Sequence, residues 1–508
     1  MTDSRKPDAG PLSRLIDGAL EPFAPGLVRK RMAERIALDH IRQYDVAAQG
    51  RRTQGWRRPS TSANREVQQG LVKTRDSARE LVRNNKYAAS ALRQMTANVI
   101  GDGITARATH DDPAVAAAAQ ADWDRFAEGR PDGRHDHYGQ QKLLFRSMAE
   151  GGESLAVWGP DSEGPNGRCR ILEGDFLDHL KSSDSATAPI VQGVEFGRDG
   201  GRAKYWLLDQ HPGDSRGFGR RSRPWSAEHI DHVFEELRPG QVRGISWFAP
   251  VAMDLRDIQD YEEAILMKRK VEACLALVLT PPDNGNASPL FDGDGDGGGQ
   301  GGGAGEAKTP DTMRPGMVFR ARPGETAQAV NPSSSGDGLD VIRARLMGVA
   351  ANLAPYHLVT GDPSQSNYSS LRAMMLGFWA NLDDWQQNVM VPLFCQPAFA
   401  RRMRRLALQT GDLRFLAVKP QFAMPVRRFL DPIRDAAGLA AELRLGVESY
   451  PRVLAARGLN PQDHLEEIAA FAAAADKLKL ALDGDPRRTT QSGVLQAAAG
   501  YLAGRPAD

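Results

Sequence analysis

The stretch 359-VTGDPSQSNYSSLRAMMLGFW-379 joins a polar, turn-rich segment directly to a long helical pattern. Its first half is rich in Gly, Asp, Pro, Ser and Asn, and either Ser369 or Ser370 is a suitable N-terminal cap for the helix. Apolar residues then recur at intervals of 4, 3, 4, 3 and 4, which is the spacing of one helix face. This stripe consists of Leu371, Met375, Phe378, Leu382, Trp385 and Val389. The pattern predicts a loop followed by a helix that packs on a core, with no catalytic residues beside it.

Length and charge restrict the class of protein. The chain has 508 residues, which is too long for one ordinary domain and suggests about three. Lys and Arg number 65 and Asp and Glu 64, so the net charge is +1, and any contact with DNA must be local or weak. Three cysteines without CxxC spacing argue against a disulfide framework or a zinc knuckle and fit a reducing compartment. No window approaches about 18 uninterrupted apolar residues, so we expect no membrane partner.

The N-terminal half is predicted to be an arm followed by an α+β domain. Residues 1–70 are rich in Arg and polar residues, which favours an extended, partly disordered arm. From Thr74 to Gly101 the apolar spacing predicts one amphipathic helix. Up to residue 248, short alternating runs such as SLAVWG, IVQGVEF and AKYWLLD are separated by Gly, Asp and Pro, which is typical of strands joined by turns.

Two predicted helices bracket an insert in the middle of the chain. The first covers residues 249–279, with acids in its first half and Lys268, Arg269 and Lys270 in its second, as the helix dipole prefers. These three basic residues are also candidates for contacts with the DNA backbone or between subunits. A glycine-rich tract at 292–306, which cannot form a core, and a strand-like run, GMVFRARPGE, lie within 280–336. The second helix covers 337–354.

The C-terminal part combines a basic segment with helices. Residues 371–430 carry the apolar stripe and the run RRMRR, which consists of Arg401, Arg402, Met403, Arg404 and Arg405. A solvated face, ion pairs between subunits and contacts with DNA phosphates all remain open for these arginines. Residues 431–484 hold three helical units with caps and stops, and 485–508 are expected to be a flexible tail.

Signatures of catalysis are missing or incomplete. The sequence has no GxxxxGK[ST], HExxH or GxSxG motif. The run from Asp292 to Asp296 matches the opening of a calcium-binding loop but has Gly303 where the closing glutamate belongs. His135, Asp136 and His137 could ligate a metal, as in a metal-dependent nuclease, but they lie in a polar run typical of a solvated loop. The sequence therefore predicts no enzyme, no cofactor and no metal.

Several stretches, in order from about Arg75 to Phe471, resemble the lambda-type family of tailed-phage portal proteins. They include RNNKYAASAL, GDGI, GGESL, RPGQVRGISWFAPV, YEEAILMKRKVEA and SGDGLDVIRARLMGVAANLAPYHLVTGDPSQSNYSSLRA. The resemblance implies a subunit of a dodecameric ring at the unique vertex of a phage or prophage capsid. Double-stranded DNA would pass through this ring during packaging and ejection, without sequence specificity. Another ring-forming head–tail connector is the alternative.

The resemblance also implies a division of the chain and a set of partners. Residues 71–248 would form the wing, 249–279 and 337–354 the two stem helices, 280–336 the clip, 355–370 the tunnel loop, 371–430 a wing helix with the basic segment, and 431–484 the crown. Terminase, a head–tail adaptor, and capsid and scaffold proteins would be the partners. The protein would reside in the virion after assembly in the cytoplasm of the bacterial host.

The tunnel loop would face the DNA channel. Its candidate channel-facing residues are Tyr356, His357, Gln365, Ser366, Asn367 and Tyr368. Duplex DNA carries one phosphate charge about every 1.7 Å, so a basic side chain repeated twelve times would hold the DNA. A polar loop without a dense group of cations therefore suits passage.

Overall fold

The computed structural model describes residues 60–130, 132–159, 168–214, 221–274, 277–279, 318–320, 338–364, 367–427, 431–457, 459 and 461–480, together with Gly26 and Lys30. The chain divides into two units, Met1–Ser62 and Ala63–Asp508, and nearly all described residues belong to the second. This unit mixes helices with small, mainly antiparallel sheets, as the α+β prediction requires. None of the described helices is long and apolar enough to cross a membrane.

The predicted helix from Thr74 to Gly101 is in fact two helices, α3 (Ala63–Asn84) and α4 (Lys86–Val99). Asn85 separates them because its backbone is extended and its side-chain oxygen accepts hydrogen bonds from the amides of Tyr87 and Ala88, at 3.0 and 3.2 Å. Asparagine at this position therefore ends one helix and caps the next. Helix α3 also begins at Ala63, so the expectation of an arm up to residue 70 is wrong for the last eight residues.

A three-stranded antiparallel sheet has the order β3 (Cys169–Glu173), β2 (Glu153–Trp158) and β8 (Ile230–Phe234). Every residue of β2 is buried, because it pairs on both sides and α6 (His137–Gly151) packs against it. The second sheet has the order β4 (Ile190–Val191), β5 (Val194–Phe196), β6 (Arg202–Leu208) and β7 (Ser222–Ser226). Strands therefore form at SLAVWG, IVQGVEF and AKYWLLD, as predicted.

Two elements join distant parts of the chain to this body. Strand β1 (Thr105–Thr109) pairs in antiparallel register with β11 (Lys419–Ala423). Helix α5 (Pro113–Glu128), which begins at the cap Asp112, packs against β1. Neither α5 nor α6 was predicted, because their apolar spacing is weak within a region dominated by turn residues.

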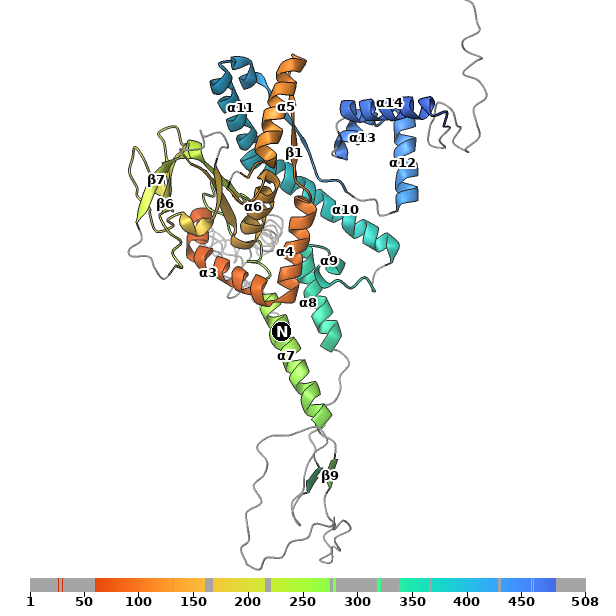
Figure 1. The fold of residues 1–508 in the computed structure, drawn as a ribbon. Helices are drawn as coiled ribbons and strands as arrows, with labels where there is room; N and C mark the ends of the chain where they lie inside the picture. The colour runs from red at the N-terminus through yellow and green to blue at the C-terminus, as the bar shows by residue number, and fades with distance from the viewer. Residues whose placement is uncertain are drawn as a thin grey trace, which may run out of the picture. The chain divides into compact units, whose positions relative to one another are not determined.

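Helices α7 (Ala252–Cys274) and α8 (Gly338–Asn352) lie side by side (Figure 1). Arg345 of α8 reaches Asp254 and Asp257 of α7, at 2.7 and 3.4 Å. Helix α7 is shorter than the predicted 249–279, because β9 (Leu277–Leu279) pairs in parallel with β10 (Val318–Arg320). Strand β10 lies in the predicted strand-like run, whereas the glycine-rich tract 292–306 lies outside the described residues.

A long helical segment follows the short helix α9 (Tyr356–Thr360). It consists of α10 (Tyr368–Asp384), the π-helix η5 (Trp385–Cys395) and α11 (Gln396–Thr410). The C-terminal helices are α12 (Pro432–Leu445), α13 (Tyr450–Ala456) and α14 (Pro461–Lys477). Asp431 caps α12 and Gly446 ends it in the left-handed conformation, at φ 72°, as the predicted cap and stop require. The predicted tail at 485–508 lies outside the described residues.

A buried ion network joins α3 to both sheets. The carboxylate of Glu153, at the start of β2, accepts hydrogen bonds from Arg75 of α3 at 2.7 Å and from Arg243 Nε at 2.9 Å. It also lies 3.0 Å from Nε2 of His232 in β8, and Gly244 donates its backbone amide at 3.1 Å. Burial alone would raise the pKa of Glu153, but Arg243 and its other partners hold that pKa well below its usual range.

Two glycines allow the chain to close around this network. A Cβ on Gly244 would lie 2.0 Å from the carbonyl oxygen of Gly152, and Gly152 itself has a φ of 94°. The GGESL and RPGQVRGISWFAPV stretches, quoted above for their family resemblance, therefore meet in space. Glu153 comes from the first stretch, and Arg243 and Gly244 come from the second.

Replacing Glu153 with Gln should strongly destabilise the protein, because it leaves Arg75 and Arg243 buried without their counter-charge. We expect a loss of about 3–5 kcal/mol, measured by chemical denaturation. The matched control is Glu66→Gln, which removes the exposed 2.8 Å ion pair with Arg238 and should cost less than about 1 kcal/mol. Equal effects of the two substitutions would contradict the central role of Glu153.

Candidate functional site

The segment predicted to be a tunnel loop is partly helical. Tyr356 and His357 lie in α9, and Tyr356 packs against the main hydrophobic core. The ring of His357 is half-buried, and this burial lowers its pKa. The expectation of a continuous loop over 355–370 is therefore wrong for α9, and Tyr356 in particular supports the core.

Asn367, rather than Ser369 or Ser370, caps α10. Its side-chain oxygen accepts the backbone amide of Ser370 at 2.8 Å, and the hydroxyls of both serines donate to the same oxygen at 2.8 Å. The hydroxyls of Ser369 and Ser370 therefore stabilise the side chain of Asn367, which forms the cap. Tyr368 follows with an exposed ring, whereas Gln365 and Ser366 lie outside the described residues.

The apolar stripe on α10 and η5 faces the core. Met375, Phe378, Leu382, Trp385 and Val389 are buried, and Leu371, at the first turn, is half-buried. Trp385 lies 4.7 Å from Trp247, measured between ring centroids, at the end of the RPGQVRGISW stretch. The stripe thus anchors the segment 367–370 to the rest of the fold.

Two arginines of the RRMRR run are structural. Arg402 is buried and binds Asp122 of α5 through Nε and Nη2, at 2.6 and 2.7 Å. Arg401 binds Asp231 at 2.6 Å and donates to the backbone oxygen of Glu228. Arg402 therefore cannot contact DNA phosphates, which corrects its assignment as a candidate DNA-backbone residue, and Arg401 is already neutralised within the subunit.

The remaining basic candidates lie nearer the surface. Arg404 is exposed and Arg405 half-buried on α11. On α7, Lys268 is half-buried, and Arg269 and Lys270 are exposed. The structure does not bring these two groups together in one basic patch, because α7 contacts α8 and α3, whereas α11 contacts α5, η5 and η6 (Leu413–Ala417).

His135 and His137 do not form a metal site. His135 binds Asp132 at 2.9 Å, and Asp136 caps α6 by accepting the amide of Gly139. His137 is fully buried and stacks on Phe394, at 5.3 Å between ring centroids. The nuclease alternative loses its proposed ligands, because the two imidazoles serve different local structures.

The surroundings of His137 keep its ring neutral. Its ring packs among Trp123, Phe126 and Phe394, and neither nitrogen has a hydrogen-bond partner in the described structure. Burial lowers the pKa of His137 to about 4, since this apolar site disfavours the charged form.

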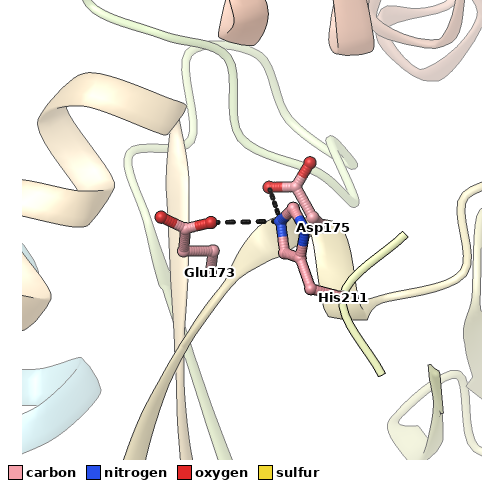
Figure 2. Close-up of side chains that lie close together, drawn as sticks. All are labelled: Glu173, Asp175 and His211. Carbon is pink, nitrogen blue, oxygen red and sulfur yellow. Dashed lines mark ion pairs between the residues drawn. The ribbon is translucent and has the colours of Figure 1, made fainter. Parts of the chain in front are cut away.

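Among the described residues, one group of acids and histidine converges closely enough to hold a cation. Figure 2 shows Glu173 and Asp175 beside the ring of His211, whose Nε2 lies 3.2 and 4.0 Å from the two carboxylates. Arg79 of α3 already occupies the position between these carboxylates, at 2.9 Å from Glu173 and 2.5 Å from Asp175. Burial would raise the pKa of Asp175, but Arg75 and Arg79 lower it. The guanidinium thus takes the role that a metal ion would have.

Cys169 and Cys395 offer no nucleophile either. Cys169 and Cys395 are buried, and burial raises the pKa of both thiols. The described part of the chain therefore combines buried ion pairs and packing surfaces with a polar cap at 367–370, and it presents no group of residues arranged for catalysis.

Comparison with known proteins places the chain in a family. Residues 49–386 match the sequence profile described as phage portal protein, lambda family. The chain therefore belongs to the lambda family of phage portal proteins.

Individual relatives agree with this family. The chain is 22% identical to the portal protein of Escherichia phage N15 over 479 residues, covering 83% of this chain and 87% of that protein. It is 28% identical to a probable portal protein of Halomonas phage phiHAP-1 over 249 residues, or 44% of this chain and 47% of that protein. The second alignment thus spans about half the length of that relative.

Solved structures with some likeness come from gene transfer agent (GTA) particles. One is the neck of an empty particle computed with C6 symmetry, with a TM-score of 0.39, 14% identity, and coverage of 76% of this chain and 94% of that one. Another is the neck of a native particle computed with C12 symmetry, with a TM-score of 0.35, 13% identity, and coverage of 81% and 98%.

The burial of His137 predicts a pH dependence of stability. Above pH 6.5 the imidazole is neutral in both states, whereas between about pH 6.5 and 4 only the unfolded chain takes up the proton. Stability should therefore fall as the pH drops through this window, and His137 should account for about 2 kcal/mol of the loss at pH 5. His137→Phe should reduce the fall in melting temperature between pH 7 and pH 5. An unchanged pH profile would contradict a buried, neutral His137.

Proposed function

We propose that this chain forms a closed ring at one vertex of a phage capsid, through which double-stranded DNA is packaged and ejected. Family membership supplies the class of protein. The observation that carries the ring is the apolar surface of α7 and α8, where Met253 is 71%, Met267 60% and Leu339 67% exposed in the single subunit. Several large apolar side chains exposed on neighbouring helices of one subunit favour a contact surface there.

In a head-to-tail ring, the neighbouring subunit covers this apolar surface. Each subunit of such a ring presents two different faces, and rotation closes the assembly so that every face meets its complement. Helix α12 supports the same interpretation, since none of its residues is buried and Ile433 and Leu445 are strongly exposed. We infer twelve subunits from the family resemblance.

In this proposal α7 and α8 are the stem, and residues 280–336 between them are the clip. The two sheets with α3–α6 form the wing, and α12–α14 form the crown. Gln365, Ser366, Asn367 and Tyr368 line the channel, while α9, with Tyr356 and His357, supports them. The arrangement is supported by the anchoring of 367–370 on the buried stripe and by the exposure of Tyr368.

The ring acts as a conduit and docking platform without catalytic activity of its own. Terminase and the head–tail adaptor dock on it, and capsid and scaffold proteins surround it. It resides in the virion after assembly in the cytoplasm of the bacterial host. Purified rings should therefore show no ATP hydrolysis that survives removal of contaminating enzymes, in keeping with the missing phosphate loop.

Substituting the exposed apolar residues of the stem should prevent ring formation. Met253→Asp and Met267→Asp each place a carboxylate at every subunit contact, where losing its hydration is strongly unfavourable. Light scattering and electron microscopy should show rings for the wild type and monomers for both variants. Leu180→Asp is the control, because Leu180 is equally exposed but lies outside α7 and α8. Rings in both stem variants, or loss of rings in the control, would contradict the proposed interface.

Substitutions in 365–367 should separate DNA passage from stability. Gln365→Ala with Ser366→Ala should leave melting temperature and ring formation near wild type, because in this proposal both side chains face the channel, and substitutions away from a core usually change stability by less than about 0.5 kcal/mol. Asn367→Ala removes the cap of α10 and should cost about 1 kcal/mol. Lysine at 365 and 366 should make DNA retention by the rings strongly dependent on salt. Salt-independent DNA retention by the lysine variant would mean that another segment lines the channel.

A further inference from the structure

A groove of about 340 Å³ lies between α7 and α8, the two helices proposed above as the stem. Its lining consists of Asp257, Ile258, Asp260 and Tyr261 of α7 with Val341, Ile342 and Arg345 of α8. Ile258 and Ile342 are buried, whereas Asp257 and Asp260 are exposed. The groove therefore combines an apolar floor with an acidic rim.

The two acids of the rim differ in how well their own subunit balances them. Asp257 lies 3.4 Å from Arg345, across the groove on α8. The side chain of Asp260 is 66% exposed, and its ion pair with Arg256, one helical turn earlier, spans 4.0 Å. An exposed pair of this length contributes little to stability. Asp260 is therefore the carboxylate of the rim that a further cation can pair with.

The face of α8 that points away from the groove carries complementary side chains. Leu339 and Arg343 are four residues apart and so share one face, whereas Val341, which lines the groove, is two residues from each. Leu339 is 67% exposed. The guanidinium of Arg343 lies 3.7 Å from Asp340, which is itself 76% exposed. One subunit thus presents an acidic groove on one side of α8 and an apolar and basic surface on the other.

These two surfaces lie at the same level of the stem. Helices α7 and α8 run antiparallel, as two contacts show: Arg345 binds Asp254, and a Cβ on Gly338 would lie 3.1 Å from Ile265. Arg343 lies between these contacts along α8, and Asp260 lies between them along α7. Rotation about an axis parallel to the stem keeps each residue at its level. The rotation that builds a head-to-tail ring therefore brings Arg343 of one copy to the level of Asp260 in the next.

We propose, on the basis of the ring inferred above, that this groove receives Leu339 and Arg343 from α8 of a second copy of this chain. Arg343 pairs with Asp260, and Leu339 covers the apolar floor. The charges are complementary, and Leu339 belongs to the exposed apolar surface that carries the proposed ring, so the groove continues that interface. Each subunit then uses two different faces of one helix pair, as head-to-tail closure requires.

Charge reversal in the full-length chain tests this contact. Asp260→Arg and Arg343→Asp each place like charges together at every subunit contact, and each should raise the subunit concentration for half-maximal ring formation at least about tenfold. Light scattering and electron microscopy measure this concentration. The double variant restores opposite charges and should return it to within about threefold of wild type. Asp76→Arg is the matched control, because Asp76 is 64% exposed with a 4.0 Å pair to Arg79 but lies on α3, and it should leave ring formation unchanged.

An equimolar mixture of the two single variants distinguishes a contact between subunits from one within a subunit. When the variants alternate around a ring of twelve, every groove meets the opposite charge. We therefore expect rings from the mixture at a concentration where neither variant forms them alone, which also shows that both variants fold.

No rings from the mixture, or loss of rings in Asp76→Arg, would overturn the proposed contact. Rings of either single variant at the wild-type concentration would overturn it as well, while leaving the proposed function intact. A wild type that forms no rings would instead contradict the proposed function, and the contact with it.

Discussion

The carboxylate of Glu153 is the constraint on which the packing of α3 against the two sheets depends. It is fully buried, and it receives Arg75 from α3, Arg243 from the segment after β8, and His232 from β8 itself. Arg243 extends the network by donating to the carbonyl oxygens of Gln192 and Gly174, beside each of the two sheets. One helix and two sheets are thereby joined to the same buried carboxylate. Other arrangements of these elements are strongly unfavourable, because they would leave the buried arginines without their counter-charge.

The sequence predicted elements whose signals are local. The cap at Asp431, the proline after it and the stop at Gly446 mark α12 without reference to any other segment. Where several polar residues lie close together, sequence rules alone do not select the one that caps a helix. At α10 the cap is Asn367, not Ser369 or Ser370. The end of α7 was wrong for a different reason, since helical spacing continues beyond Cys274 while pairing with β10 extends the chain there.

Contacts between distant residues explain the remaining differences at the candidate site. The RRMRR run looked uniformly basic, yet Arg402 binds Asp122, which lies 280 residues earlier in the chain. His137 belongs to an aromatic cluster with Phe394 rather than to its neighbour His135. Such pairings leave no periodic or compositional trace, so the sequence could indicate the residues but not their partners. Many basic side chains of the described residues form ion pairs with acids of the same subunit, in keeping with the net charge of only +1.

The π-helix between α10 and α11 makes chain length critical in this region. Within η5 the hydrogen bonds span five residues, as from the amide of Gln396 to the carbonyl of Val391, and Pro392 is accommodated in it. Each residue of an α-helix turns the chain by about 100°. Losing one residue from η5 would therefore rotate all of α11, carrying Arg402 away from Asp122 and Arg401 away from Asp231. Natural variation in this segment should consequently occur by substitution, while insertions and deletions gather elsewhere in the chain.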